Sequence, residues 1–378
     1  MPDQAWITGV GLADVPAPGR RAIDLFVQAG SRAVRDAALG PDDIDGLVTG
    51  YSLVDDALMP ADATAEALGT RPSTCFTLNA GGATGTSLLR QAELLIRAGR
   101  CRHVLVAWAD NRASGASQQA VVSKLAGVGH PDLEAPLAPT IPALYALHAT
   151  RYLAETGATA HDLAEIAVAF RRHAARNPAA HKRAQITTDD VRGSPSIAVP
   201  LTRLDCCLIT DFGAALVVSA TPGDTPNRPI AVAATAEGHA HEHLLATARL
   251  GSSISGRVAT EALVAAGRRV EDLDLLMVYD SFTITAAIQL EELGIAPAGS
   301  AGAMARDGAF DLDGTLPVNT NGGMLSAING GIHLVAEAVL QLQGRATGRQ
   351  VSDADLALVN GIGGILSSHV AVALEGAT

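Results

Sequence analysis

The sequence predicts an α/β fold made of two similar halves, with a helical segment inserted between them. Two observations predict it: an order of elements that occurs twice along the chain, and a stretch of different composition between the two occurrences. The 48% of hydrophobic residues can build a large core, whereas the 17% of charged residues is too low for a disordered chain. Since only 3% of the residues are aromatic and 38 are Gly, the core must consist of small and aliphatic side chains packed closely.

The first sign of duplication is a pair of similar segments near the start of each half. Residues 33–50 read AVRDAALGPDDIDGLVTG, and residues 262–279 read ALVAAGRRVEDLDLLMVY. Each segment predicts an alanine-rich helix, a turn with an Asp-x-Asp centre and a short apolar strand. The aspartates of the two centres are Asp43 with Asp45 and Asp272 with Asp274.

The similarity continues further along both halves. In the first half, residues 79–82 stand before a helix, and an apolar strand follows at residues 103–109. In the second half, residues 319–323 stand before a helix, and an apolar strand begins at Leu356. Because four elements match in order, the sequence favours duplication of one α/β unit over chance similarity.

A helical and polar stretch, residues 112–202, separates the two halves. One helix within it ends at Gly157, and a second ends at Asn177 and Pro178. Two interpretations of its local positive charge remain open: a solvated helix face, or a cap that holds a phosphorylated ligand over the core. The charged residues are Arg171, Arg172, Arg176, Lys182 and Arg183.

Charge and cysteine content exclude several classes of protein. The net charge is −12 and there is no basic run, so binding to nucleic acid through its phosphates is not expected. No apolar stretch approaches the roughly 20 residues of a membrane span, and the first residues lack the order of a signal peptide. The four cysteines form neither a CxxC pair nor a disulfide framework. We therefore expect a cytoplasmic enzyme.

Five segments, taken in order, carry a resemblance to a known family. The chain resembles the thiolase superfamily, and within it the sterol-carrier-protein-type thiolases and their lipid-transfer-protein relatives, which include aldolases. The resemblance covers nearly the whole chain. The segments are Asn79–Gly85, Pro200–Ala215, Tyr279–Gly294, Leu316–Ser326 and Asn360–Gly364.

The resemblance implies a five-layered αβαβα fold of two duplicated halves. It places the N-terminal half at residues 1–111 and 203–242, an inserted loop domain at residues 112–202, and the C-terminal half at residues 243–378. It also implies coenzyme A thioester chemistry and a homodimer.

The catalytic positions depart from the pattern of the family. Where a thiolase carries its nucleophilic Cys at a helix start, this chain has Gly82 within NAGGATG. A helix N-terminus makes a Cys reactive, but Gly has no sulfur, so no acyl-enzyme can form there. Asn329 stands where the His of the G-H-P motif is expected, and Gly361 stands where other thiolases carry a second Cys. In the H-D-C-F motif, Tyr279 and Ser281 replace His and Cys.

The residues that remain can still act on a carbonyl group. Backbone N–H groups at Gly82 and Gly364, with the amide of Asn329, would form a site for an oxyanion. Tyr279 would donate or accept a proton, aided by its neighbour Asp280. The structural alternatives are a strand-end residue for Tyr279 and a carboxylate that caps a neighbouring turn for Asp280.

Three histidines form a weaker pattern. His239, His241 and His243 alternate, so an extended backbone would turn all three toward one face, where they would suit a transition metal. A polar loop that leaves a core strand is the simpler interpretation. We expect no metal and no bound cofactor, with the coenzyme A thioester acting as substrate.

The departures favour carbon–carbon chemistry without a cysteine. Retro-Claisen cleavage releases an acyl group that a thiolate must capture, whereas retro-aldol cleavage of a 3-hydroxyacyl-CoA releases a ketone or an aldehyde. The leading hypothesis is therefore retro-aldol cleavage of a branched or steroid-type 3-hydroxyacyl-CoA, as the resemblance implies. Two alternatives stay open: a non-catalytic acyl-CoA-binding or scaffold subunit, and an acyltransferase or thiolase with a relocated nucleophile.

The resemblance also implies partners for this chain. A homodimer would form through the strand at residues 103–109, because that pairing would continue the sheet and remove an exposed edge. A small partner chain with an OB-fold and a zinc ribbon would complete the acyl-CoA site. Activity is then expected mainly in the complex.

Overall fold

The computed structural model describes residues 4–137 and 139–377. Within these residues, nine strands form one mixed sheet in the order β3-β2-β4-β7-β1-β8-β11-β10-β9. The strands are β1 (Ala5–Leu12), β2 (Gly46–Thr49), β3 (Thr74–Thr77), β4 (His103–Asn111), β7 (Asp211–Ser219), β8 (Ile230–His239), β9 (Leu275–Val278), β10 (Leu356–Gly363) and β11 (Ser368–Gly376). A separate small hairpin pairs β5 (Ser196–Ala198) with β6 (Leu201–Thr202).

The strand pairings repeat between the two halves. In the first half, β2 and β4 run parallel, and β4, β7 and β1 alternate in direction. In the second half, β9 and β10 run parallel, and β10, β11 and β8 alternate in the same way. The halves join where Ala5–Ile7 of β1 pairs with Ile230–Val232 of β8. The predicted duplication of an α/β unit is confirmed.

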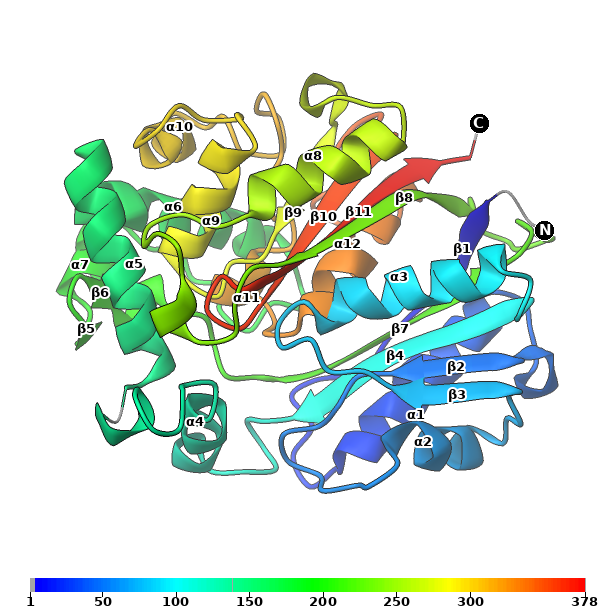
Figure 1. Ribbon diagram of the computed structural model, residues 1–378. Coiled ribbons are helices and arrows are strands. Elements are labelled where there is room, and N and C mark those ends of the chain that lie inside the picture. The colour runs from blue at the N-terminus through cyan, green and yellow to red at the C-terminus, as the bar shows by residue number, and fades with distance from the viewer. Residues whose placement is uncertain (1–3, 138, 378) are drawn as a thin grey trace.

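The sheet folds over at the β1–β8 junction, so its two halves form two layers and helices form the other three (Figure 1). Helices α3 and α12 lie between the two halves of the sheet. Helices α1 and α2 cover one outer face, and α8 and α9 cover the other. No helix in the described part of the chain is both long enough and apolar enough to span a membrane. The α-helices are α1 (Ala22–Asp36), α2 (Pro60–Leu68), α3 (Thr84–Arg97), α4 (Gln118–Ala126), α5 (Ile141–Thr156), α6 (Ala160–Arg176), α7 (Thr188–Gly193), α8 (Ser255–Ala265), α9 (Thr283–Glu292), α10 (Ala301–Arg306), α11 (Gly323–Ser326) and α12 (Gly331–Leu342).

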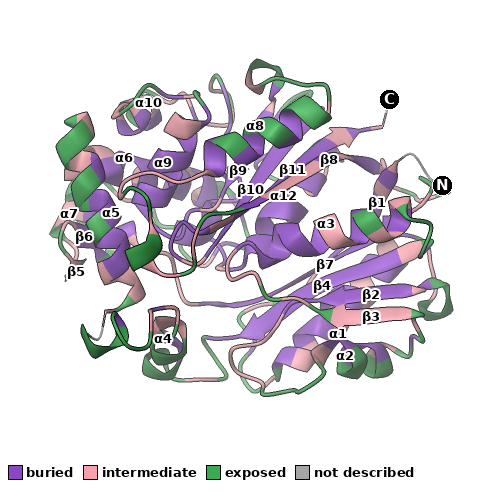
Figure 2. Ribbon diagram, in the orientation of Figure 1, coloured by how far each residue is buried: buried purple, intermediate pink, exposed green. Residues whose placement is uncertain are grey.

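The two central helices approach each other closely where both begin. A Cβ atom added to Gly85 of α3 would lie 2.5 Å from the backbone nitrogen of Ile332 in α12. The central layer and the strands beside it are buried (Figure 2). The core is therefore packed through small residues, as the composition predicts, and the starts of α3 and α12 lie side by side.

The inserted segment packs onto the second half of the molecule. Side chains of α5 and α6 share one apolar core with α8, α9 and α10. Arg171 of α6 is buried and donates to Ser326 Oγ, and Arg172 pairs with Asp311 at 2.9 Å. These two cations therefore tie the insert to the second half.

The expectation that the strand at residues 103–109 forms the dimer edge is wrong. This strand lies within β4, which pairs with β2 on one side and β7 on the other. The sequence predicts a strand here, but it does not give the order of strands in the sheet. The outermost strands are β3 and β9. Asn319 bonds with the backbone of Val278 and covers the outer side of β9.

Candidate active site

A cavity of about 800 Å³ is lined by residues from both halves and from the insert. Its walls include the start of α3, the segments that follow β2, β4 and β9, the segment before α12 and the turn between β10 and β11. The lining residues that bear on the chemistry are Tyr51, Gly82, Trp108, Arg112, Lys124, Tyr145, Cys207, His239, His241, Tyr279, Ser281, Asn329 and Gly364. Four of the five predicted site residues, Gly82, Tyr279, Asn329 and Gly364, therefore meet in one place.

Tyr279 fills the space that a side chain at position 82 would need. A Cβ atom added to Gly82 would lie 2.1 Å from the hydroxyl oxygen of Tyr279 and 2.4 Å from the carbonyl oxygen of Ile362. The phenol therefore reaches the N-terminal end of α3, where a helix favours negative charge. The space that a side chain at position 82 would need is thus taken by the side chain of residue 279, and we call this pair of changes the steric exchange.

The position of the second expected Cys is also closed. A Cβ atom added to Gly361 would lie 2.3 Å from Thr86 Oγ1 of α3. Thr86 in turn donates to the carbonyl oxygen of Ala83. The structure thus has no room for a thiol at either of the two positions where the resemblance leads us to expect one.

The phenol of Tyr279 holds its proton firmly in the free protein. Burial raises the pKa of Tyr279 well above its ordinary value, and the neighbouring Cys207, Tyr145 and Tyr51 raise this pKa further. The charge of Arg112 acts in the opposite direction. A neutral Tyr279 can donate a hydrogen bond in this cavity, but it accepts a proton only after it has ionised.

Asp280 does not join Tyr279 in the cavity, which corrects the expectation that it aids proton transfer. Its carboxylate accepts the backbone N–H groups of Met324 at 2.9 Å and Leu325 at 3.1 Å. A Cβ atom at Gly323 would lie 2.0 Å from Asp280 Oδ2. Burial raises the pKa of Asp280 to about 7. The geometry matches the alternative interpretation, a buried carboxylate that caps the turn of α11.

Asn329 lines the cavity, and both N–H donors of its side-chain amide have partners. Its Nδ2 donates to the carbonyl oxygen of Leu208 at 2.5 Å and to Cys207 Sγ at 3.4 Å. Its backbone N–H donates to Thr210 Oγ1. An amide carries two N–H donors, so an oxyanion would have to replace the thiol of Cys207, a weak acceptor, as the partner of one of them.

Gly364 lies beside the start of α3. A Cβ atom at Gly81 would lie 3.0 Å from the backbone nitrogen of Gly364, so the two glycine turns are in contact. Tyr145 donates its hydroxyl to the carbonyl oxygen of Gly364 at 2.9 Å, which fixes the turn. Gly364 has φ +59°, a conformation that side-chain-bearing residues rarely adopt.

Sequence reasoning missed Tyr51, Tyr145 and Arg112, which line the cavity together with the predicted Tyr279. Tyr51, Tyr145 and Tyr279 are three of only four tyrosines in the chain, and all line this cavity. Arg112 follows the last residue of β4 and also lines it. The scarcity of Tyr, and a cation directly after a buried strand, were the available signals. None of the five cations of the insert named above is among the lining residues that the structure describes.

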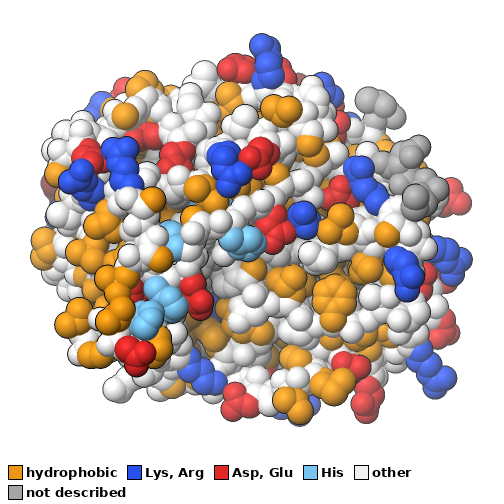
Figure 3. Space-filling model, viewed as in Figure 1, with side chains coloured by type: hydrophobic (Ala, Val, Ile, Leu, Met, Phe, Trp, Pro, Cys, Tyr) orange, Lys and Arg blue, Asp and Glu red, His pale blue; other side chains and the backbone are white. Residues whose placement is uncertain are grey.

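The three alternating histidines make three different contacts. His239 bonds to Glu237 and Ser368, His241 donates to the carbonyl oxygen of Ile365, and the His243 ring lies 4.9 Å from that of His130. Histidine side chains gather on the face shown in Figure 3. Within the described ranges, no group of His, Cys, Asp and Glu side chains has the arrangement of a metal site. The contacts fit the polar-loop interpretation.

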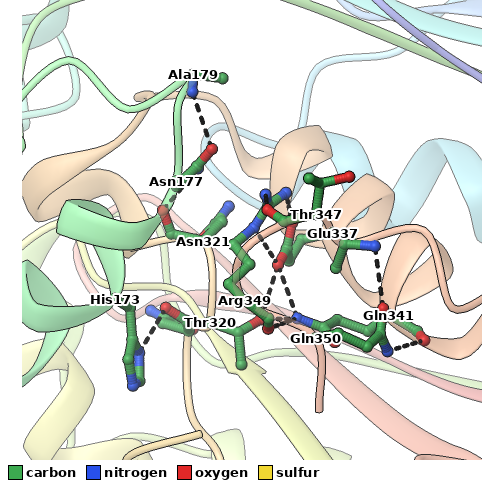
Figure 4. Close-up of polar contacts among 12 residues, drawn as sticks. His173, Asn177, Ala179, Thr320, Asn321, Glu337, Gln341, Thr347, Arg349 and Gln350 are labelled. Atoms are coloured by element: carbon green, nitrogen blue, oxygen red, sulfur yellow. Dashed lines mark hydrogen bonds and ion pairs between the residues drawn. The ribbon is translucent and has the colours of Figure 1, made fainter. Parts of the chain in front are cut away.

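A buried polar network joins the loop before α11, helix α12 and the segment after α12 (Figure 4). Arg349 pairs with Glu337 of α12 through two bonds, at 2.9 and 2.7 Å. Thr320 donates to the same carboxylate at 2.8 Å, and Gln341 joins all three. The network ties the loop before α11 to the middle of α12, and so fixes the segment that carries Asn329.

Known proteins share both the sequence and the fold. A family model described as "Thiolase C-terminal domain-like" matches residues 236–376. The chain is 33% identical over 359 residues to 17-hydroxy-3-oxo-4-pregnene-20-carboxyl-CoA lyase of Mycobacterium tuberculosis, covering 90% of this chain and 92% of that protein. It is 32% identical over 398 residues to a steroid side-chain-cleaving aldolase of Thermomonospora curvata, covering 97% of each.

The solved structure of the Ltp2-ChsH2(DUF35) aldolase matches with a TM-score of 0.86 and 29% identity, over 99% of this chain and 98% of that one. The chain therefore belongs to the thiolase superfamily, as its motifs predict. Its relatives within that superfamily include steroid side-chain-cleaving aldolases, which are lyases rather than acyltransferases.

Proposed function

We propose that this chain is an aldolase that cleaves a carbon–carbon bond of a branched or steroid-type 3-hydroxyacyl-CoA without a cysteine. The observation that carries the proposal is the phenol of Tyr279, which occupies the space required by a side chain at position 82. A proton-transfer group thus replaces a nucleophile. The substrate class rests on the relatives, one a steroid side-chain-cleaving aldolase and another a steroid carboxyl-CoA lyase.

The reaction needs one proton to move twice. An ionised Tyr279 would accept the proton of the 3-hydroxyl group while the bond between C2 and C3 breaks. The bonding electrons would pass to the thioester as an enolate, held by Asn329 and by backbone N–H groups near Gly82 and Gly364. Tyr279 would then return the proton to C2, which releases the shortened acyl-CoA and a ketone.

The test is product analysis with a tertiary 3-hydroxyacyl-CoA. We expect the shortened acyl-CoA and the ketone in equal amounts by mass spectrometry, and a rate that rises with pH because only the phenolate accepts the proton. Tyr279→Phe keeps the ring and removes the transferable proton, so the rate should fall by at least about 10²-fold. Full turnover of Tyr279→Phe would contradict the mechanism.

A relocated thiol nucleophile would have to be Cys207, the cysteine among the described residues that line the cavity. Burial raises the pKa of this thiol to about 12, and the charge of Asp280 adds to the effect, so the thiolate is disfavoured. Cys207→Ala should therefore retain cleavage. Loss of cleavage in Cys207→Ala, together with an acylated wild-type protein by mass, would favour the acyltransferase alternative.

We also propose a homodimer and an OB-fold, zinc-ribbon partner that completes the acyl-CoA site. Coenzyme A carries several phosphate charges, and the cations among the described lining residues are Arg112 and Lys124. Lys124 already bonds to Leu53 and Asp56. The similar solved structure is named as a two-component assembly. Absence of cleavage even with such a partner present would favour a scaffold subunit.

A further inference from the structure

Arg112 is a buried cation that the proposed reaction does not yet use. The residue is 7% exposed, lines the cavity and follows directly after β4. Its Nε donates to Asp110 at 2.9 Å, whereas its Nη2 has no hydrogen-bond partner among the described residues. A buried guanidinium donor without a partner is costly unless another group accepts from it when the site is in use.

Two features strengthen the field of Arg112 in the cavity. Its guanidinium carbon lies 4.9 Å from the ring centre of Phe212 and 5.8 Å from that of Trp108, so the cation packs against two aromatic rings. The charge of Asp110 is shared, because this carboxylate also accepts from Ser52 Oγ and from the backbone N–H of Leu53. Asp110 therefore balances the charge of Arg112 only in part.

We propose that Arg112 is a positioning residue that stabilises negative charge on the phenol oxygen of Tyr279. The inference rests on the proposed function, in which ionised Tyr279 accepts the first proton. Trp108, whose ring Arg112 faces, and Tyr279 both border Gly331, since a Cβ atom added to Gly331 would lie 3.7 Å from the Trp108 ring and 3.6 Å from the Tyr279 ring. A charge acts strongly across a buried site of low dielectric such as this one. The other titratable groups that face Tyr279 are Tyr51, Tyr145 and Cys207, and each disfavours its ionisation.

The test measures ionisation of residue 279 directly. A fluorinated tyrosine, whose phenol is more acidic than that of Tyr, would be incorporated at position 279 and titrated by its ultraviolet absorbance and by fluorine NMR. We expect Arg112→Gln to raise the pKa of this phenol by at least one pH unit, a tenfold change in ionisation. Arg112→Lys keeps the charge and should raise the pKa of the phenol by less.

Arg171→Gln is the matched control. Arg171 is also buried, but it donates to Ser326 and Ala184 outside the cavity, so its loss should leave the titration unchanged. Should Arg112→Gln not fold, Asp110→Asn tests the same effect of Arg112 in the opposite direction. This variant removes the negative charge that partly balances Arg112, so it should lower the pKa of the phenol.

The outcomes separate this inference from the proposed function. An unchanged pKa of the phenol in Arg112→Gln, or a raised pKa of the phenol in Asp110→Asn, would overturn the role of Arg112 even if the enzyme cleaves its substrate. The expected shift in a protein that cleaves no 3-hydroxyacyl-CoA would uphold the role and refute the function. With activity present, the pH–rate profile of Arg112→Gln should move to higher pH by the same amount as the titration.

Discussion

The exchange between Gly82 and Tyr279 can be tested at the scale of single residues. Gly82→Cys would bring its Cβ atom to about the position of the phenol, so we expect a loss of about 1–3 kcal/mol in the free energy of unfolding. Tyr279→Ala opens the space, and the double variant should regain part of that stability. Thermal unfolding of both single variants and the double variant measures the coupling. Additive effects would contradict the steric exchange.

Asp280 gives a prediction for the dependence of stability on pH. Its pKa rises from the ordinary value of 3.8 to about 7 in the folded protein, so between these values the folded state binds the proton more firmly than the unfolded state. The contribution of Asp280 to the free energy of unfolding is fully present below pH 3.8 and is lost as the pH rises toward 7. At about 1.4 kcal/mol per pH unit, the loss approaches about 4 kcal/mol.

The matched variant is Asp280→Asn, which cannot titrate. Denaturant unfolding from pH 4 to pH 7 should show a smaller decline in the variant than in the wild type. Equal slopes in the two proteins would show that Asp280 ionises normally.

Sequence reasoning found four residues of the cavity and missed others. The order of motifs was enough to bring Gly82, Tyr279 and Asn329 together, because each follows or precedes a predictable element. It could not show that Asp280 turns away from its neighbour, since the direction of a side chain after a strand depends on tertiary contacts. Arg112 was missed because it belongs to no motif that the family resemblance carries.

At the scale of elements, the Glu337–Arg349 pair holds α12 to the segment that follows it, and Thr320 of the loop before α11 donates to the same carboxylate. The two side chains are 3% and 10% exposed, and other polar groups complete their bonding. Breaking a buried pair leaves the other charge uncompensated, so Glu337→Gln should cost about 3–5 kcal/mol in unfolding free energy. The control is Glu261→Gln, which breaks an exposed pair with Arg257 and should cost less than about 1 kcal/mol.

The elements themselves were largely predictable. The repeated helix, turn and strand at residues 33–50 and 262–279 correspond to α1 with β2 and to α8 with β9. The counterpart of β3 in the second half is reduced to a bridge between Leu276 and Val318. That reduction follows from packing of the loop that contains Asn319, which periodicity does not reveal.

At the scale of the whole molecule, β3 is the place where a second copy would extend the sheet. Thr74 and Leu78 donate their backbone N–H groups to Asp45 and Thr49 beside β2, so by alternation the N–H groups of Cys75 and Thr77 point outward. An unpaired edge of this kind favours pairing with another chain. Figure 2 shows β3 less buried than β2 and β4.

We therefore expect a dimer at micromolar concentration by light scattering, and a monomer for Cys75→Pro, which removes one outward N–H. Cys75→Ala is the control and should remain dimeric. A wild-type monomer, or a dimeric Cys75→Pro, would exclude β3 as the interface.

The closure of positions 82 and 361 also bears on how this chain can change over evolutionary time. A cysteine at either position collides with a neighbour, Tyr279 or Thr86. Thiolase chemistry at either position would therefore require at least two substitutions, one to cysteine and one of the neighbour with which it collides. Natural selection acts on single steps, and a cysteine introduced first would lower the stability of the protein, so such a change is not easily made.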